Sequence, residues 1–178
     1  CNSMTKFFLS SHGHLASGLA SSLDILLGGH DKITVFDAYV DEKSLNDALD
    51  AFFKNVGADD PVILLSDMYG GSVNSTMYTY LDRPNTILVA GVNLALVIGL
   101  TILEGDITRE TLESVIEQSR EAIRIVDLEK SDEKEEDELF SQTANQEIAV
   151  QKMDSKVSSI GIGGQYYYPG YYPWNSTT

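Results

Sequence analysis

The chain has 178 residues, of which 43% are hydrophobic and 22% charged, an ordinary globular composition for one domain with some additional chain. Its net charge of −15 argues against nucleic acid and anionic membrane surfaces as partners, and no apolar run approaches the roughly 20 residues of a membrane helix, so we expect no direct membrane insertion. The only cysteine is Cys1 and no secretory signal is visible, so we expect no disulfide framework, no cysteine metal cluster and a cytoplasmic protein.

Apolar runs alternate with amphipathic stretches up to residue 128, once residues 1–3 ahead of Met4 are set aside. The pattern predicts, in chain order, strand 6–10, helix 14–27, strand 32–36, helix 44–56, strand 61–67, helix 72–81, strand 85–90, helix 93–103 and helix 108–122. The segment 123–128 alternates like a strand and could equally form the last turns of the preceding helix.

Local signals support several of these elements. The first helix is expected to gather five leucines on one face and to end at Gly28 and Gly29; the leucines are Leu15, Leu19, Leu23, Leu26 and Leu27. Ser44 and Thr108 are placed to cap the starts of their helices. The third strand is apolar throughout, as a strand buried on both faces should be.

Residues 129–178 have a different composition. Residues 129–138 hold seven acids and two lysines, and residues 165–174 are rich in tyrosine and proline. We therefore expect domain boundaries of 4–128 for the folded part and 129–178 for an acidic, then aromatic-rich, flexible tail. The alternative is a docking segment, because clustered Tyr and Trp side chains make good contact anchors.

Alternating strands and helices predict a three-layer α/β/α fold with a mostly parallel sheet. Ligands of such sheets bind outside the carboxyl ends of the strands. The residues to inspect are therefore those that follow each strand, in the segments 11–14, 37–39, 67–72 and 91–93.

Two of these turns carry residues suited to phosphoryl transfer. His12 follows the first strand and Asp67 ends the third, and the first and third strands of a doubly wound sheet are commonly neighbours. A carboxylate that holds one imidazole nitrogen leaves the other free to attack. The amides of Gly70 and Gly71 and the Ser72 hydroxyl, at a helix start, would form an anion pocket beside the ring. Singly, each residue is more often a turn or cap residue; their joint placement favours a phosphohistidine.

The other two histidines are expected to have lesser roles. His14 lies at a helix start, where the positive dipole end disfavours a charged imidazole, and is expected to contact a partner. His30 lies at the opposite end of the sheet and is read as a turn residue. Three histidines at these spacings do not make a zinc site, so we predict no metal and no cofactor.

The chain resembles the enzyme IIA domain of the mannose family of the bacterial sugar phosphotransferase system. The matching segments are residues 8–13 with Leu15 and Ala16, Gly18 with Leu19, residues 64–72 and residues 90–94. The resemblance covers residues 4–128 and departs from the family at Val73 and Ala95, where proline is common. Proline at a first helical turn is helpful rather than required, so we expect the geometry to be kept.

The resemblance implies that His12 accepts the phosphoryl group at Nε2, with Asp67 on its other nitrogen and Gly71 and Ser72 around the group. It implies the phosphocarrier protein HPr as donor, an enzyme IIB component as acceptor, and sugar uptake as the result. His14 and Tyr69 are expected to contact these partners. The resemblance also implies a homodimer, often formed by exchange of a C-terminal edge strand that residues 123–128 would match, and the chain would be a free-standing IIA component.

Three alternatives remain open. A related domain of the same fold donates phosphoryl groups to a dihydroxyacetone kinase. A receiver-like signalling domain would be phosphorylated on Asp67, but it needs acidic residues after the first strand to hold magnesium, where this chain has Ser10, Ser11 and His12. A plain binding module would act through the aromatic tail, and deletion of residues 129–178 would then abolish its function.

Overall fold

The computed structural model of the protein describes residues 4–129, so the expectations for residues 1–3 and 130–178 lie outside the described residues. Nine elements follow one another as the sequence pattern predicts, within a few residues at each end. They are β1 (Lys6–His12), α1 (Leu15–Leu27), β2 (Ile33–Ala38), α2 (Leu45–Lys54), β3 (Val62–Ser66), α3 (Ser72–Tyr78), β4 (Thr86–Ala90), α4 (Leu94–Thr101) and α5 (Arg109–Glu121).

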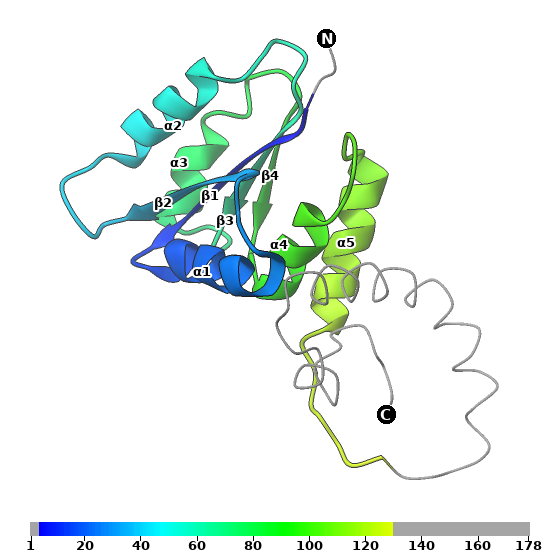
Figure 1. Ribbon diagram of the computed structural model, residues 1–178. Helices are drawn as coiled ribbons and strands as arrows, with labels where there is room; N and C mark the ends of the chain where they lie inside the picture. Colours follow the sequence, from blue (N-terminus) through cyan, green and yellow to red (C-terminus); the bar gives the residue numbers. More distant parts are fainter. Residues whose placement is uncertain (1–3, 130–178) are drawn as a thin grey trace.

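The four strands form one parallel sheet in the order β2-β1-β3-β4 (Figure 1). The first and third strands are neighbours, as expected, with Ser10 opposite Ser66 in the register. All five residues of β3 are buried, which explains why its sequence is apolar without alternation. All four carboxyl ends therefore lie at one edge of the sheet.

Helices cover both faces of the sheet and give the expected three layers. Alternating residues of β1 point to opposite faces: Phe7 and Leu9 pack with α1, α4 and α5, whereas Phe8 packs with α2 and α3. Each face therefore has its own apolar cluster, and the strands between them are fixed from both sides.

The predicted helix ends are confirmed where a cap could be read from the sequence. The Ser44 hydroxyl accepts a hydrogen bond from the Asp47 amide at 3.3 Å, and the Thr108 hydroxyl accepts one from the Thr111 amide at 3.2 Å. Gly28 ends α1 with φ of 80°, in the left-handed region that favours glycine.

Two expectations are corrected. Leu15 is 49% exposed rather than part of the packed face, because it is the first residue of α1 and lies at the edge of the sheet. Residues 123–128 form neither a strand nor further helix in the single chain, and Ile123, Ile125, Val126 and Leu128 are 76–94% exposed. The segment pairs with neither edge strand of the four-stranded sheet, and the exchanged strand in a dimer stays a prediction.

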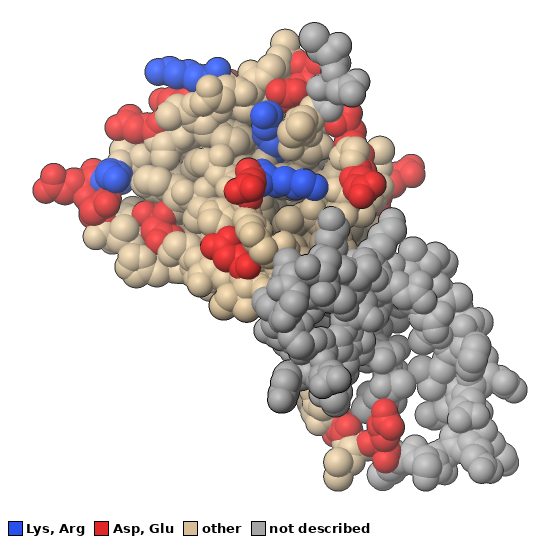
Figure 2. Space-filling view, in the orientation of Figure 1, with Lys and Arg blue, Asp and Glu red and all other residues tan. Residues whose placement is uncertain are grey.

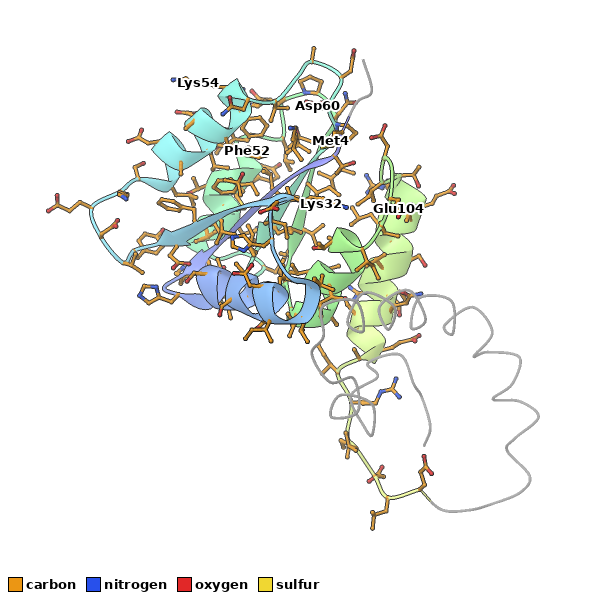
Figure 3. All side chains as sticks on the ribbon, viewed as in Figure 1. Met4, Lys32, Phe52, Lys54, Asp60 and Glu104 are labelled. Atoms are coloured by element: carbon orange, nitrogen blue, oxygen red, sulfur yellow. The ribbon has the colours of Figure 1, made fainter. Side chains whose placement is uncertain are left out.

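Polar contacts close the opposite edge of the sheet, where the strands begin (Figure 3). The Met4 amide donates to Asp60 Oδ1 at 3.2 Å, and Lys32 Nζ donates to the Thr101 carbonyl at 3.0 Å at the end of α4. Among residues 4–129, no helix combines the length and the apolar character that crossing a bilayer requires.

Candidate active site

His12 is the last residue of β1, at the carboxyl edge of the sheet. The chain turns at Gly13, which has φ of 60° and donates its amide hydrogen to the Ala38 carbonyl at 2.9 Å. The hydroxyl of Ser11 then accepts the Ala16 amide at 2.7 Å and so provides a partner for an amide in the first turn of α1. With the backbone held on both sides, the His12 side chain projects from the edge of the sheet and is 44% exposed.

Asp67 follows β3 and meets His12, as the sequence predicts. One carboxylate oxygen, Oδ2, lies 2.8 Å from the His12 amide and 2.8 Å from Nδ1 of the ring. Burial raises the pKa of Asp67, but hydrogen bonds from the His12 amide and ring outweigh it, and the pKa is lowered overall. An ionised carboxylate can only accept, so Nδ1 carries the proton and Nε2 keeps a free lone pair.

Ser72 faces that second nitrogen, with its Oγ 3.0 Å from Nε2. Gly70 turns the chain with φ of 75°, and a Cβ at Gly71 would lie 3.4 Å from Cε1 of His12, beside the reactive nitrogen. The Gly71 amide differs from expectation, because it already donates to the Met68 carbonyl at 3.3 Å. Free amides are instead supplied by the first turn of α3, which starts at Ser72.

Tyr39 joins the site from β2. Its hydroxyl donates to Ser72 Oγ at 2.7 Å, and its ring centroid lies 5.3 Å from that of His12. Sequence reasoning placed Tyr39 at a strand end without giving it a role. Its position one residue beyond Ala38, which pairs with His12 in the β1–β2 register, brings it to the site, and that register is known only from the structure.

His14 forms a separate pair with Asp37, which sequence reasoning missed. His14 Nδ1 lies 2.9 Å from Asp37 Oδ2, and the Ser17 amide and hydroxyl donate to the same carboxylate at 2.9 and 2.6 Å. Burial raises the pKa of Asp37, but the hydrogen bonds from Ser17 and His14 prevail and lower it. The His14 side chain is 78% exposed.

Exposed apolar side chains surround the His12 cluster. Tyr69 and Met68 follow Asp67 and are 87% and 60% exposed, and Leu15 and Tyr39 are 49% and 63% exposed. Tyr69 lies two residues after Asp67 and is exposed, and its contact with a partner stays a prediction. His30 pairs with Asp24 at 2.6 Å at the other end of α1. Acidic side chains are scattered over the face of the described part that Figure 2 shows.

The arrangement suits nucleophilic attack by Nε2 on an electrophile that carries negative charge. A carboxylate fixes the ring tautomer, the Ser72 hydroxyl adjoins Nε2 and is itself hydrogen-bonded by the Tyr39 hydroxyl, and a helix start supplies amides. Within residues 4–129 no group of three or more His, Cys, Asp or Glu side chains is placed to hold a metal ion.

Comparison with known proteins points the same way. A family model described as the PTS system fructose IIA component matches residues 6–120. Nothing among the curated proteins matches the chain.

Solved structures with the same fold include three from bacteria. One, assigned as a phosphoenolpyruvate-dependent sugar phosphotransferase system permease of Klebsiella pneumoniae, is 30% identical, with a TM-score of 0.64 over 70% of this chain and 92% of that one. The EIIA component of Streptococcus agalactiae is 25% identical, with a TM-score of 0.53 over 70% and 97%. The mannose/sorbose-specific IIA subunit of Enterococcus faecalis, 24% identical with a TM-score of 0.59 over 72% and 99%, shares the fold.

Proposed function

The chain belongs to the family of fructose and mannose IIA components of the sugar phosphotransferase system, and on that premise we propose that it is a phosphoryl carrier with His12 as acceptor. HPr would supply the phosphoryl group and an enzyme IIB component would receive it, so that the carrier serves sugar uptake. The observation that carries the proposal is the pair of contacts on the His12 ring, with Asp67 on Nδ1 and the Ser72 hydroxyl near Nε2.

The transfer step follows from the ring's protonation. Nε2 attacks the phosphorus of phosphohistidine on HPr, a P–Nε2 bond forms, and the P–N bond to HPr breaks with its electron pair returning to the HPr ring. The Nδ1 proton of His12 stays in its hydrogen bond with Asp67, whose negative charge stabilises the positive charge that develops on the ring. In the second transfer, a nucleophile of enzyme IIB attacks the phosphorus, and the P–Nε2 bond breaks with its electron pair returning to the His12 ring.

Several groups favour the phosphoryl group once it is on Nε2. The Ser72 hydroxyl, 3.0 Å from Nε2, can turn to donate to a phosphoryl oxygen, and the amides of the first turn of α3 lie at the same place. Glycine at position 71 leaves the edge of the ring uncrowded. The exposed apolar side chains of Leu15, Tyr39, Met68 and Tyr69 give a protein partner a surface to bind near His12.

Phosphorylation in a reconstituted system tests the proposal. The protein is incubated with phosphoenolpyruvate, enzyme I and HPr, and intact-mass measurement should show one added phosphoryl group that fragmentation places on His12. The bond should survive alkali and hydrolyse in mild acid, whereas an aspartyl phosphate on Asp67 would be lost in alkali. A chain lacking residues 129–178 should accept equally, because the site lies within residues 12–72.

Two results would contradict this function. Acceptance that needs magnesium and gives an alkali-labile product would indicate the receiver-like alternative. A phosphorylated protein that passes its group to a dihydroxyacetone kinase and not to enzyme IIB would place it in the other pathway.

We also propose a homodimer, which rests on the exposed segment after α5. Ile123, Ile125, Val126 and Leu128 are apolar and 76–94% exposed, and an apolar alternating segment is suited to pairing with a sheet edge. Light scattering should show two chains for protein ending at residue 130. A monomer whose melting temperature is unchanged by truncation after Ala122 would rule out the exchanged strand.

A further inference from the structure

Tyr39 is held in a backbone conformation that most side chains avoid. Its φ is 65°, in the left-handed region, directly after β2. A non-glycine residue in this region is strained and persists where surrounding contacts fix it. The carbonyl of Ala38, one residue before, accepts the amide of Gly13, one residue after His12. The turns that carry Tyr39 and His12 are thus tied to each other through the backbone.

The side chain of Tyr39 completes a directed chain of hydrogen bonds. Asp67 accepts from Nδ1 of His12, so Nε2 must accept from Ser72, whose single hydroxyl proton points to the ring. The Ser72 oxygen then accepts the proton of the Tyr39 hydroxyl at 2.7 Å. Without Tyr39, the Ser72 hydroxyl could rotate freely or turn to water, because the side chain is on the exposed first turn of α3.

We propose that Tyr39 is a positioning residue for phosphoryl transfer, whose hydroxyl orients the Ser72 hydroxyl at Nε2 and whose ring fixes the imidazole plane. This inference rests on the proposed function of His12 as phosphoryl acceptor. When the P–Nε2 bond forms, the lone pair of Nε2 is used up and the Ser72 hydroxyl turns to donate to a phosphoryl oxygen, while the Tyr39 hydroxyl continues to donate its hydrogen bond to the Ser72 oxygen. Each proton keeps its covalent partner, so the step needs no co-reactant.

The tilted contact between the rings of Tyr39 and His12 supports the proposal that Tyr39 fixes the imidazole plane. The ring centroids are 5.3 Å apart at an interplanar angle of 35°, within the range of attractive aromatic contacts. Although Tyr39 is 63% exposed, one side of its ring lies against the imidazole. A phenylalanine at this position would keep the ring contact and remove only the hydroxyl.

The test compares Tyr39→Phe with Tyr78→Phe, an equally conservative change in a tyrosine that is 67% exposed and lies at the far end of α3 from Ser72. Rapid-quench transfer from phosphorylated HPr should be about tenfold slower in Tyr39→Phe, the loss expected for one ordered hydrogen bond, and unchanged in Tyr78→Phe. Both variants should still accept one phosphoryl group on His12. A Tyr39→Phe rate equal to that of Tyr78→Phe would overturn the inference.

A double-mutant cycle and a spectroscopic measurement separate positioning from a general structural effect. In a Ser72→Ala background, Tyr39→Phe should cause no further slowing, because the tyrosine acts through the serine; independent, multiplying losses would overturn the inference. In the unphosphorylated protein, the ¹⁵N signal of Nε2 in His12 should shift in Tyr39→Phe and stay in place in Tyr78→Phe. An unshifted signal would also overturn it. A wild-type protein that accepts no phosphoryl group would instead contradict the proposed function itself.

Discussion

Two histidine–aspartate pairs lie at the same edge of the sheet, and they differ at the second ring nitrogen. Nδ1 is 2.8 Å from the carboxylate in His12–Asp67 and 2.9 Å in His14–Asp37. Nε2 of His12 faces the Ser72 hydroxyl at the start of a helix, whereas no hydrogen bond to Nε2 of His14 is found within residues 4–129. The two pairs share the contact that selects the ring tautomer and differ only around the other nitrogen, and on this difference rests the proposal that His12, not His14, is the acceptor.

The carboxylates of Asp67 and Asp37 also differ in the groups that they bind. Asp67 directs one oxygen to both the amide and the ring of His12, and its other oxygen is buried with no hydrogen bond among residues 4–129. Asp37 shares its oxygens between His14 and both donors of Ser17, in the first turn of α1. We therefore expect Asp67 to act on transfer and Asp37 to act on the stability of this turn.

Removal of each imidazole should give the largest contrast. His12→Ala should accept no phosphoryl group from HPr, because the nucleophile is gone, and His14→Ala should still accept one. Intact-mass measurement after incubation with phosphoenolpyruvate, enzyme I and HPr compares them. Equal loss in both variants, or loss only in His14→Ala, would reverse the assignment of the two pairs.

Neutralising each carboxylate should give the next largest contrast. Asp67→Asn should slow transfer about 100-fold, because an amide can present its NH2 group to Nδ1 and favour the wrong tautomer; orienting groups of this kind contribute roughly 100- to 10,000-fold. Asp37→Asn is the matched control and should keep the rate within about twofold, since it leaves the His12 tautomer unchanged.

Rapid-quench kinetics and thermal melts measure both carboxylate variants. An Asp67→Asn rate equal to wild type would mean that Asp67 only caps the turn to Ser72, since asparagine caps as well as aspartate. The melts should show the Asp67→Asn fold intact, so that slower transfer reports the site.

Replacing Ser72 or Ser17 by alanine should have smaller effects, on the transfer rate in the first case and on stability in the second. Ser72→Ala should slow transfer about tenfold with little change in stability, because its hydroxyl contacts Nε2 on an exposed turn. Ser17→Ala should leave the rate unchanged and lower the free energy of unfolding by about 1 kcal/mol, because it removes a donor to the part-buried Asp37 carboxylate. Urea unfolding and the kinetic assay measure the two effects. Slower transfer in Ser17→Ala, or a larger loss of stability in Ser72→Ala, would contradict this prediction.

The smallest expected effect is on acid stability, where both histidine–aspartate pairs should act in the same direction. The pKa values of Asp67 and Asp37 are lowered in the folded protein, so each ionised carboxyl contributes stability above its unfolded pKa that is lost as the pH falls through the folded pKa. Between about pH 5 and pH 2, Asp67→Asn and Asp37→Asn should each lose less stability than wild type. Steeper acid loss in either variant would contradict the shift for that residue.

The features that depend on short-range hydrogen bonds and on strand order could be predicted from the sequence. The caps at Ser44 and Thr108 follow from short-range hydrogen bonds, and the meeting of His12 with Asp67 follows from the parallel sheet and the adjacency of its first and third strands. The contact of Tyr39 with Ser72 was beyond sequence reasoning, because it depends on a left-handed residue that turns the side chain of one strand end toward another.

The remaining misses have equally specific causes. Leu15 is the first residue of α1 and lies beside the buried face rather than on it, so it is exposed although its neighbour Ala16 is fully buried. The amide of Gly71 is taken by a turn hydrogen bond to Met68 that the Gly-Gly-Ser pattern does not reveal. Residues 123–128 carry a strand-like pattern, but the described chain pairs them with no strand and leaves their apolar side chains exposed.

One oxygen of Asp67 accepts hydrogen bonds from both the backbone amide and the ring of His12. The residues that position His12 are therefore distinct from the exposed residues that a partner protein would contact. The nucleophile is anchored to the two central strands, whose buried positions tolerate little change. Met68, Tyr69 and Val40 lie on surface loops around it, where substitutions are tolerated. We therefore expect substitutions in these exposed residues to change which partner protein binds, while the contacts of His12 with Asp67 stay in place.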